Sequence, residues 1–180
     1  QWEQEPGNRR AAISPVRGQG LLTFEGDCVV RERIDVVFPV LHGANGEDGA
    51  MQGLLQLAGI PYVGSHVAAS AVAMDKTLTK LVADQAGIRQ AAWRLVWSGE
   101  HQKERVLNAL EEQFQYPMFV KPAGTGSSVG VSKVKNREEL IAALETAAQY
   151  DRKILVEEFI HGREIEVAVM GNDSPVASIC

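Results

Sequence analysis

The sequence predicts an α/β protein in which an open α/β domain is followed by an α+β domain. The first domain is indicated by residues 34–41, a nearly continuous apolar run that precedes a glycine-rich loop and a helical pattern. The second is indicated by residues 118–134, where an apolar strand leads into a glycine- and serine-rich loop and a return strand. The pattern changes near residues 74–76, so we place the domains at residues 1–74 and 75–180.

The composition excludes several classes of protein. Hydrophobic residues make up 45% of the 180 residues and charged residues 23%, the balance of an ordinary globular protein. The net charge of −5 argues against a nucleic-acid partner, which needs a basic surface. No apolar run approaches the roughly 20 residues that span a bilayer, and the polar start has no signal-peptide pattern. Two isolated cysteines, Cys28 and Cys180, suit reduced thiols, so we expect a cytoplasmic protein without a membrane partner.

The first domain is expected to begin with loops and short strands and to continue as strand, loop and helix. Its expected elements are strands at 11–14, 21–24, 34–41 and 62–63, a helix at 50–58 and helical turns at 67–73. The apolar run of 34–41 suits a strand that is buried on both faces of a parallel sheet. In the helix, apolar residues recur at helical spacing, and Gly59 follows as its C-cap.

Helices and strands alternate in the second domain. Helices are expected at 76–86, 101–115 and 137–150, and strands at 94–97, 118–121, 129–134, 153–160 and 164–169. Asn136, with Glu139 three residues later, matches the capping box that begins a helix. Apolar and polar residues alternate from 164 to 169, as they do in a half-exposed antiparallel strand. Residues 175–180 suggest a further strand that is cut short.

The most informative segment is residues 119–131, in which Lys121 ends an apolar strand and a loop rich in glycine, serine and threonine follows. Phosphate oxygens bind to closely approaching backbone N–H groups, hydroxyl donors and fixed cations, all of which this segment offers. It is not a Walker A loop, because the lysine precedes the glycines and no helix follows at once. A solvent-exposed hairpin loop is the alternative interpretation.

Residues 154–166 suggest where the base of a nucleotide would bind. The strand here ends in two acidic and two apolar residues, Glu157, Glu158, Phe159 and Ile160. Backbone groups of such a hinge can bind a base edge while apolar side chains cover the faces of the base. Glu164, just past a turn, could accept hydrogen bonds from ribose hydroxyls. The alternative for any one glutamate is a solvated strand face, which we favour for Glu166.

The loop of residues 42–49 follows an expected strand of the first domain, at the edge where open α/β sheets bind ligands. His42 is a titratable donor at this strand end, in the place of a small polar substrate, although a structural histidine is an equal alternative. Glu47 and Asp48 lie at a helix start, and for Asp48 we favour a simple interaction with the helix dipole.

Five sequence motifs occur in order and at sensible spacing: HGANGEDG, GIPYVGS, MDK, VKPAGTGSSVGVS and VEEFIHGREIEV. Together they resemble the D-alanine–D-alanine ligase family, ATP-grasp enzymes of bacterial cell-wall synthesis, over residues 34–180. Other ATP-grasp proteins share the lysine, the glycine loop and the hinge, but they are not expected to carry HGANGEDG as well. The resemblance implies a truncated N-terminal substrate-binding α/β domain, followed by the central α+β subdomain of an ATP-grasp fold.

The resemblance also implies which residues would bind the nucleotide. They are Lys76, Lys121, Gly126, Ser127, Ser128, Glu157, Glu158, Phe159, Ile160 and Glu164. The two lysines would hold the ATP phosphates, the backbone at 157–160 would bind adenine, and Glu164 would bind the ribose. The loop at 124–130 would close over the phosphates.

Two residues are implied in catalysis by the resemblance. Ser127 would belong to the hydrogen-bond set that orders the first D-alanine, and His42 would lie beside that substrate, with Glu47 as a further contact. In the family, ATP phosphorylates the carboxylate of the first D-alanine, and the amine of the second attacks the acylphosphate. Mg²⁺ neutralises the phosphoryl group during transfer. D-alanine–D-lactate ligases share these motifs, and a nucleotide-binding module without catalysis is the alternative from another class.

The remaining parts of the family pattern are expected outside this sequence. A glycine-rich loop with a glutamate for the first substrate would precede Gln1, and the catalytic arginine and Mg²⁺ ligands would follow Cys180, so no metal ligand is assigned here. The implied partners are ATP and D-alanine. Exposed apolar positions on the first-domain helices suggest a homodimer by analogy with the family.

Overall fold

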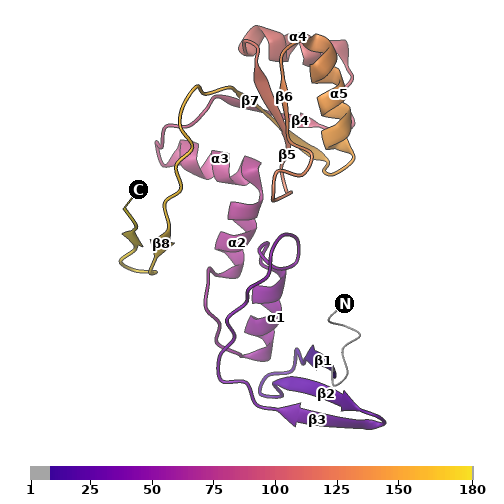
Figure 1. Cartoon of the computed structure of the whole chain (residues 1–180), viewed down its shortest axis with the longest axis vertical. Helices are drawn as coiled ribbons and strands as arrows, with labels where there is room; N and C mark the ends of the chain where they lie inside the picture. Colours follow the sequence, from indigo (N-terminus) through magenta and orange to yellow (C-terminus); the bar gives the residue numbers. More distant parts are fainter. Residues whose placement is uncertain (1–8, 180) are drawn as a thin grey trace.

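The structure, a computed structural model, describes residues 9–179 and has the mixed helix and sheet content that the sequence predicts (Figure 1). The helices are α1 (Ala50–Ala58), α2 (Val67–Met74), α3 (Lys76–Gln85), α4 (Glu104–Gln113) and α5 (Arg137–Ala148). The strands are β1 (Arg10–Ile13), β2 (Leu21–Glu25), β3 (Cys28–Glu32), β4 (Trp93–Trp97), β5 (Met118–Pro122), β6 (Ser132–Val134), β7 (Lys153–Glu158), β8 (Val169–Met170) and β9 (Val176–Ala177). Residues 1–8, expected as loop, and Cys180 lie outside the described range. No helix within that range is both long and apolar enough to cross a bilayer.

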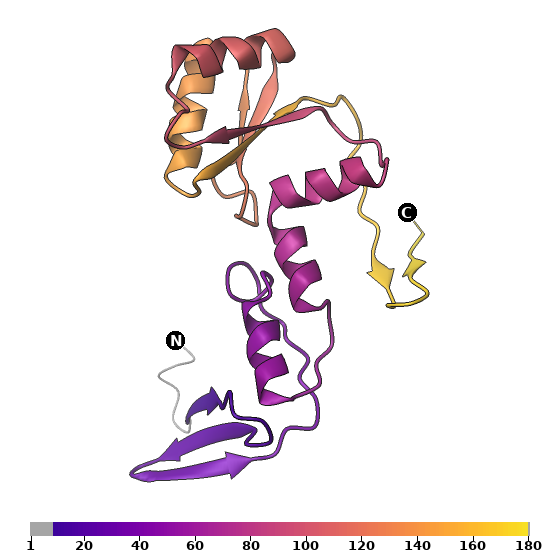
Figure 2. The same cartoon turned by 180° about the vertical axis from the view of Figure 1, so that it is seen from behind.

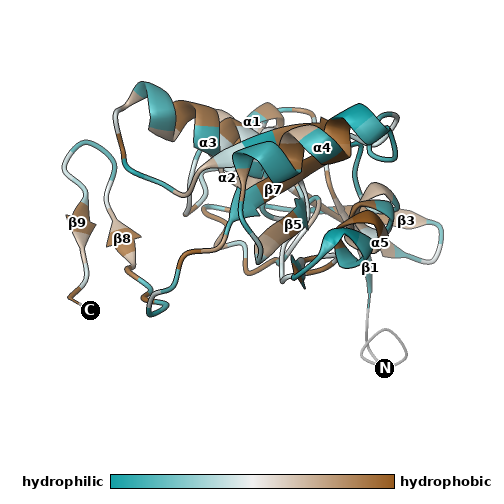
Figure 3. Ribbon diagram, turned by 90° about the horizontal axis from the view of Figure 1, so that it is seen from above, coloured by the Kyte–Doolittle hydropathy of each residue, from teal (hydrophilic) through white to brown (hydrophobic). Residues whose placement is uncertain are grey.

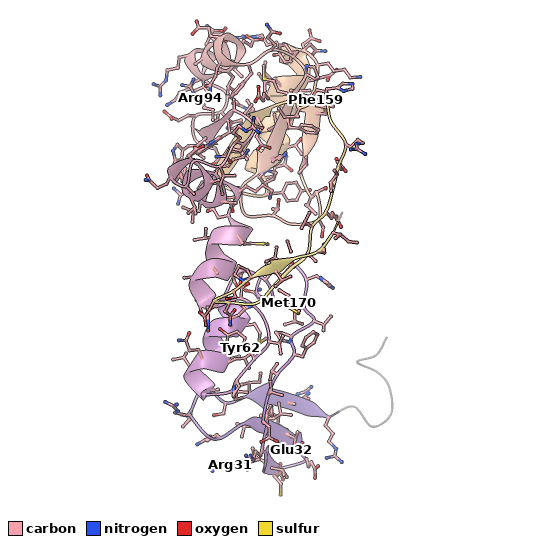
Figure 4. The ribbon with its side chains drawn as sticks, turned by 90° about the vertical axis from the view of Figure 1, so that its left-hand side faces the viewer. Arg31, Glu32, Tyr62, Arg94, Phe159 and Met170 are labelled. Atoms are coloured by element: carbon pink, nitrogen blue, oxygen red, sulfur yellow. The ribbon has the colours of Figure 1, made fainter. Side chains whose placement is uncertain are left out.

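Three sheets are distributed along the length of the molecule (Figure 1, Figure 2). The sheet β1-β2-β3 lies at one end, and the four-stranded sheet β4-β7-β5-β6 lies at the other. α1 and α2 lie between them, and α3 packs against the four-stranded sheet. The hairpin β8-β9 returns toward the segment before α2, so that Met170 lies near Tyr62 (Figure 4).

The main hydrophobic core lies between the four-stranded sheet and the helices α4 and α5. Its fully buried members include Met118, Val120, Val156, Leu140 and Leu144. Burial of one such side chain stabilises the fold by roughly 1.5–3 kcal/mol relative to exposure. α4 is amphipathic, with a polar outer surface and apolar residues toward the sheet (Figure 3). This layer covers one face of the sheet and leaves the opposite face open to a ligand.

Side chains alternate between the two faces along each strand, so the residues between the core residues lie on the opposite face. In β5, Phe119 and Lys121 alternate with the buried core residues and therefore point away from them. The register places Phe119 opposite Glu157 of β7 and opposite Lys133 of β6. Directly opposite residues of an antiparallel pair share a face, so these four side chains lie on the side of the sheet that α4 and α5 leave open.

α5 begins with the capping box that the sequence predicts. The Oδ1 atom of Asn136 accepts a hydrogen bond from the backbone N–H of Glu139 at 2.9 Å. The Glu139 carboxylate in turn accepts one from the backbone N–H of Lys135, also at 2.9 Å. The first contact satisfies a backbone donor that the first turn of a helix leaves without a partner, and the second fixes the residue before the N-cap.

We expect Asn136→Ala to lower the free energy of unfolding by about 1 kcal/mol, because the first turn of α5 would lose its side-chain acceptor. Urea denaturation of the variant and the parent measures this difference. Glu145→Ala, at an exposed position of the same helix, should change the free energy by less than about 0.5 kcal/mol. A loss at Asn136 no larger than this control would contradict the role of the cap.

A smaller hydrophobic core surrounds α1. Its buried members are Leu55, Ala58 and Ile60. The helix ends at Gly59, whose φ of 69° is left-handed, as predicted for a C-cap glycine. In Figure 1 the N-terminal end of α1 points toward the four-stranded sheet, which directs the loop before it to the same side.

The strand predicted at 34–41 is wrong for most of its length. Val37 forms one parallel bridge with Tyr62, and the predicted strand at 62–63 is likewise reduced to that bridge. Phe38 is 70% exposed and Val40 68%, so the segment is not buried on both faces. A central parallel strand needs paired neighbours on both edges. Within residues 9–179, the strand pairing of this segment is limited to that one bridge, in which Val37 exchanges backbone hydrogen bonds with Pro61 and Val63.

The strand predicted at 164–169 is also wrong. Of these residues only Val169 belongs to a strand, β8. The others are exposed, and the one backbone hydrogen bond of Ala168 with Ser178 continues the β8-β9 hairpin by a single residue. Alternation is therefore not sufficient evidence of a strand when no partner lies beside it. The sequence also does not predict β3, whose five residues are all exposed. The remaining differences concern element ends: β6 begins at Ser132 because 127–130 form a turn, β7 ends at Glu158, and α4 is shorter than predicted.

Candidate functional site

Lysine and aromatic side chains gather on the open face of the four-stranded sheet. Helix α3 lies beside this sheet (Figure 2). The group consists of Lys76, Lys80, Lys121, Lys133, Phe119 and Phe159. Such a combination suits a flat aromatic ligand that carries negative charge, because rings stack on its plane and ammonium groups neutralise its anion. We call this surface the lysine face.

A buried carboxylate lies at the centre of the lysine face. Glu157 is 6% exposed, and its Oε1 atom lies 2.5 Å from the Nζ atom of Lys80. Its Oε2 atom forms an ion pair with Lys121. Lys80 also donates a hydrogen bond to the backbone carbonyl of Ala91 at 3.3 Å. The carboxylate thus joins β7, β5 and α3 through two ammonium groups.

The charge state of Glu157 follows from these contacts. Burial acts to raise the pKa of the Glu157 carboxyl, but hydrogen bonds and charge interactions with Lys121 and Lys80 outweigh it. The pKa of Glu157 therefore lies below its ordinary value, and the group is ionised at neutral pH.

Lys76 connects α3 to the start of the glycine-rich loop through hydrogen bonds. Its Nζ atom donates hydrogen bonds to the carbonyls of Pro122 at 3.2 Å, Ala123 at 3.3 Å and Thr125. Its backbone N–H also donates to Ala123 at 3.0 Å. Burial lowers the pKa of Lys76, and the nearby charge of Lys121 lowers it further, so the two lysines belong to one electrostatic site.

The glycine-rich loop between β5 and β6 has an unusual backbone. Ser127 and Ser128 both have positive φ, 51° and 58°, a conformation that costs roughly 1–2 kcal/mol per residue for an L side chain. Both residues are exposed, and their hydroxyl groups make no hydrogen bond to residues 9–179. Consecutive backbone N–H groups and free hydroxyls at a loop tip are suited to bind an anion.

The two ends of this loop are fixed. The backbone N–H of Gly124 donates to Oδ2 of Asp151 at 2.6 Å. Gly130 has a φ of 71°, and an added Cβ would lie 2.8 Å from Pro122 and Tyr150, so only glycine fits there. Anchored ends with an exposed, unusual tip are consistent with a segment that can change its shape around a ligand.

The predicted hinge follows β7. The Phe159 ring lies 6.0 Å from the Phe119 ring, and the Nζ atom of Lys133 lies 3.6 Å from its centroid. Glu158 is used in the fold, because its Oε1 atom accepts a hydrogen bond from the backbone N–H of Ala92 at 2.8 Å. Phe159 lies beside the sheet (Figure 4), whereas Ile160 and Glu164 are exposed beyond the strand end.

The loop at 42–49 closes on itself through its acidic residues. Glu47 accepts a hydrogen bond from the backbone N–H of Gly43 at 2.5 Å. Asp48 accepts bonds from the backbone N–H groups of Asn45 at 2.8 Å and Ala50 at 3.0 Å, and these bonds lower its pKa. His42 is exposed and makes no side-chain hydrogen bond to residues in the described range. Its imidazole is therefore accessible to a ligand.

The structure brings only part of the predicted set together. Lys76, Lys121 and Glu157 lie in one electrostatic site, and Phe159 borders it. His42 and Glu47 lie in the loop before α1 and make no hydrogen bond or ion pair with this group. The sequence motifs do not single out Lys80 and Lys133. The signal for Lys80 is its spacing of four residues from Lys76, which places both side chains on the same face of a helix.

The described residues do not provide a fitting Mg²⁺ site. Among residues 9–179, no group of three or more His, Cys, Asp and Glu side chains is placed to hold a metal ion. Mg²⁺ prefers several oxygen ligands, whereas the lysine face offers ammonium groups.

Two family models match the chain. The model described as "D-ala D-ala ligase N-terminus" matches residues 6–65, and the one described as "D-ala D-ala ligase C-terminus" matches residues 82–180. The second alone covers more than half of the chain.

Curated relatives agree with the family models. A D-alanine–D-alanine ligase of Acetivibrio thermocellus is 59% identical over 149 residues, which are 82% of this chain and 40% of the relative. A protein of the same name from Bacillus cytotoxicus is 55% identical over 172 residues, which are 93% of this chain and 47% of the relative. The chain thus spans less than half the length of these two relatives.

Solved structures have the same fold. The D-alanine–D-alanine ligase of Coxiella burnetii aligns with a TM-score of 0.84 and 40% identity, over 94% of this chain and 49% of that one. The VanG D-Ala:D-Ser ligase of Enterococcus faecalis aligns with a TM-score of 0.83 and 38% identity, over 94% and 48%. The predicted α/β fold class is confirmed.

Proposed function

This chain belongs to the D-alanine–D-alanine ligase family, and on that premise we propose that the intact protein joins two D-alanines at the expense of ATP. The observation that supports this most directly is the lysine face beside the glycine-rich loop. Lys76 and Lys121 share one partly buried electrostatic site, and the free hydroxyls of the loop tip are available for an anion. This is the environment that the triphosphate of ATP requires.

In this proposal the nucleotide lies across the lysine face. The adenine ring binds at the hinge formed by residues 157–160, near the Phe119 ring, and Glu164 receives the ribose. Lys121 and Lys76 bind phosphate oxygens, and Lys76 exchanges at least one carbonyl partner for them. Gly126, Ser127 and Ser128 close over the phosphates, while Glu158 holds the hinge through Ala92.

The first domain would supply the amino-acid substrate site. His42 and Glu47 would face the first D-alanine, and Ser127 would orient it from the glycine-rich loop. The D-alanine carboxylate oxygen attacks the γ-phosphorus of ATP, and ADP leaves. The amine of a second D-alanine then attacks the acylphosphate, which forms the peptide bond, expels phosphate and releases a proton. We place this reaction in the cytoplasm, with the two residue ranges 1–74 and 75–180 as separate domains.

A direct assay tests the activity. The intact protein that contains this sequence should form D-alanyl-D-alanine, ADP and phosphate from D-alanine, ATP and Mg²⁺. The likeness to the D-Ala:D-Ser ligase makes D-serine a second candidate for the nucleophile. Mass spectrometry of products formed from D-alanine alone, or from D-alanine with D-serine or D-lactate, separates these activities. ATP binding without any dipeptide or depsipeptide product would contradict the ligase proposal.

We expect His42→Gln to raise the KM for D-alanine or to lower kcat, while the affinity for ATP stays unchanged. The reason is positional, because His42 precedes α1 in the first domain, whereas the lysine face belongs to the second domain. Steady-state kinetics in which ATP and D-alanine are varied separately measures this. A thermal melt is the control, since a lower Tm with both substrates affected would indicate a structural histidine. Unchanged D-alanine kinetics would remove His42 from the site.

A further inference from the structure

Lys80 occupies a position that the proposed nucleotide site does not explain. It lies one helical turn after Lys76 on α3, and its side chain is only 14% exposed. Its Nζ atom contacts the buried carboxylate of Glu157 rather than the open part of the lysine face. Lys80 is thus less accessible to a ligand than Lys121, whose side chain is 27% exposed.

The charges around Glu157 do not balance. One carboxylate carries a single negative charge, and two ammonium groups, those of Lys80 and Lys121, share it. The group of three therefore has a net charge of +1. If a phosphate draws Lys121 away from Oε2, Lys80 still neutralises the carboxylate through Oε1. Without Lys80, the departure of Lys121 would leave the ionised Glu157 carboxylate without a cation. Because the Glu157 side chain is only 8% exposed, such an unpaired buried charge is strongly unfavourable.

We propose that Lys80 is a positioning residue, which holds the Glu157 carboxylate and so leaves the ammonium group of Lys121 available to the phosphates of ATP. This inference rests on the proposed function, because it assumes that Lys121 binds phosphate. It assigns Lys80 no contact with the nucleotide. The effect on ATP is transmitted through Glu157.

A purely structural role for Lys80 predicts different behaviour. Lys80 also joins α3 to the segment before β4, since its backbone carbonyl accepts a hydrogen bond from Nε2 of Gln90 at 2.8 Å and its Nζ atom donates to Ala91. If fixing α3 were its only role, loss of the side chain would reduce stability and ATP affinity together. A second change at Glu157 would then not restore ATP binding.

Calorimetric titration of the intact protein with a non-hydrolysable ATP analogue separates the two roles. Lys80→Met should weaken binding about tenfold, because Glu157 would then retain Lys121 as its sole cation. Lys80→Arg, which keeps the charge, should bind within about threefold of the parent. In Lys80→Met combined with Glu157→Gln, no carboxylate retains Lys121, so the affinity should return to within about threefold of Glu157→Gln alone.

Three results would overturn the inference: unchanged affinity in Lys80→Met, failure of Glu157→Gln to restore binding, or equal losses in Lys80→Met and Lys80→Arg. If Lys80→Met unfolds too readily for titration, Lys80→Gln takes its place in the same scheme, and thermal melts of all variants are recorded. Lys121→Ala distinguishes this inference from the proposed function. If Lys121→Ala leaves ATP binding unchanged, the proposed phosphate site is wrong; if it weakens binding and Lys80→Met does not, only the inference about Lys80 is wrong.

Discussion

Lys121→Ala should weaken the binding of an ATP analogue by about 10- to 100-fold, corresponding to the roughly 1.5–3 kcal/mol of a charge-assisted contact. Lys121 lies near the end of β5 on the lysine face, beside the loop in which the hydroxyl groups of Ser127 and Ser128 make no hydrogen bond to residues 9–179. The fold itself should change little, because Lys80 continues to neutralise Glu157 after Lys121 is removed. Isothermal titration of the intact protein, together with a thermal melt, measures both quantities.

Lys135→Ala provides the matched control for this experiment. Lys135 is exposed and lies just after β6, and its side chain makes no ion pair with residues in the described range. Its loss should change ATP affinity by less than about twofold. If Lys121→Ala and Lys135→Ala behave alike, Lys121 does not bind phosphate. A large fall in Tm for Lys121→Ala would instead indicate that its pairing with Glu157 is mainly structural.

The parts of the fold that could be predicted from the sequence are those determined by local chemistry. Asn136 and Gly59 mark the ends of two helices because capping depends on a few neighbouring backbone groups. The predictions of β5 and β7 are confirmed because these two apolar segments pair with each other in the same sheet. The two wrong strand predictions, at 34–41 and 164–169, concern apolar or alternating segments that have little backbone pairing inside the described range.

The candidate site was predictable only in part, for a physical reason. Lys121 and the glycine-rich loop are contiguous in sequence, so a local pattern indicates them. Lys80 and Lys133 join the lysine face through the packing of α3 on β7 and through the register of β6 on β5. A pairing register depends on distant segments, and a single-residue slip would turn Lys133 toward the core. The membership of such residues in the site can be identified only from the assembled sheet.

Glu157→Gln should lower the free energy of unfolding by about 2–4 kcal/mol at neutral pH. Removal of one partner from a fully buried ion pair costs about 3–5 kcal/mol, and the partial exposure of Lys121 reduces this. Gln has the same size and can still accept one hydrogen bond, so the loss is mainly that of the negative charge between Lys80 and Lys121. Glu158→Gln is the control, since the amide oxygen can still accept the bond from Ala92, and its effect should stay below about 0.5 kcal/mol.

The pH dependence of this loss tests its electrostatic origin. In the folded protein the pKa of Glu157 lies below its ordinary value of 4.5, so the unfolded chain binds this proton more readily than the folded one. The stabilisation is therefore fully present above pH 4.5 and is lost as the pH falls through the lower pKa of the folded state. Urea denaturation of the parent and Glu157→Gln at about pH 7 and about pH 3 should give a difference that shrinks in acid. A difference that does not change with pH would mean that Glu157 stabilises the fold by packing, and the charge sharing between Lys80 and Lys121 would no longer explain it.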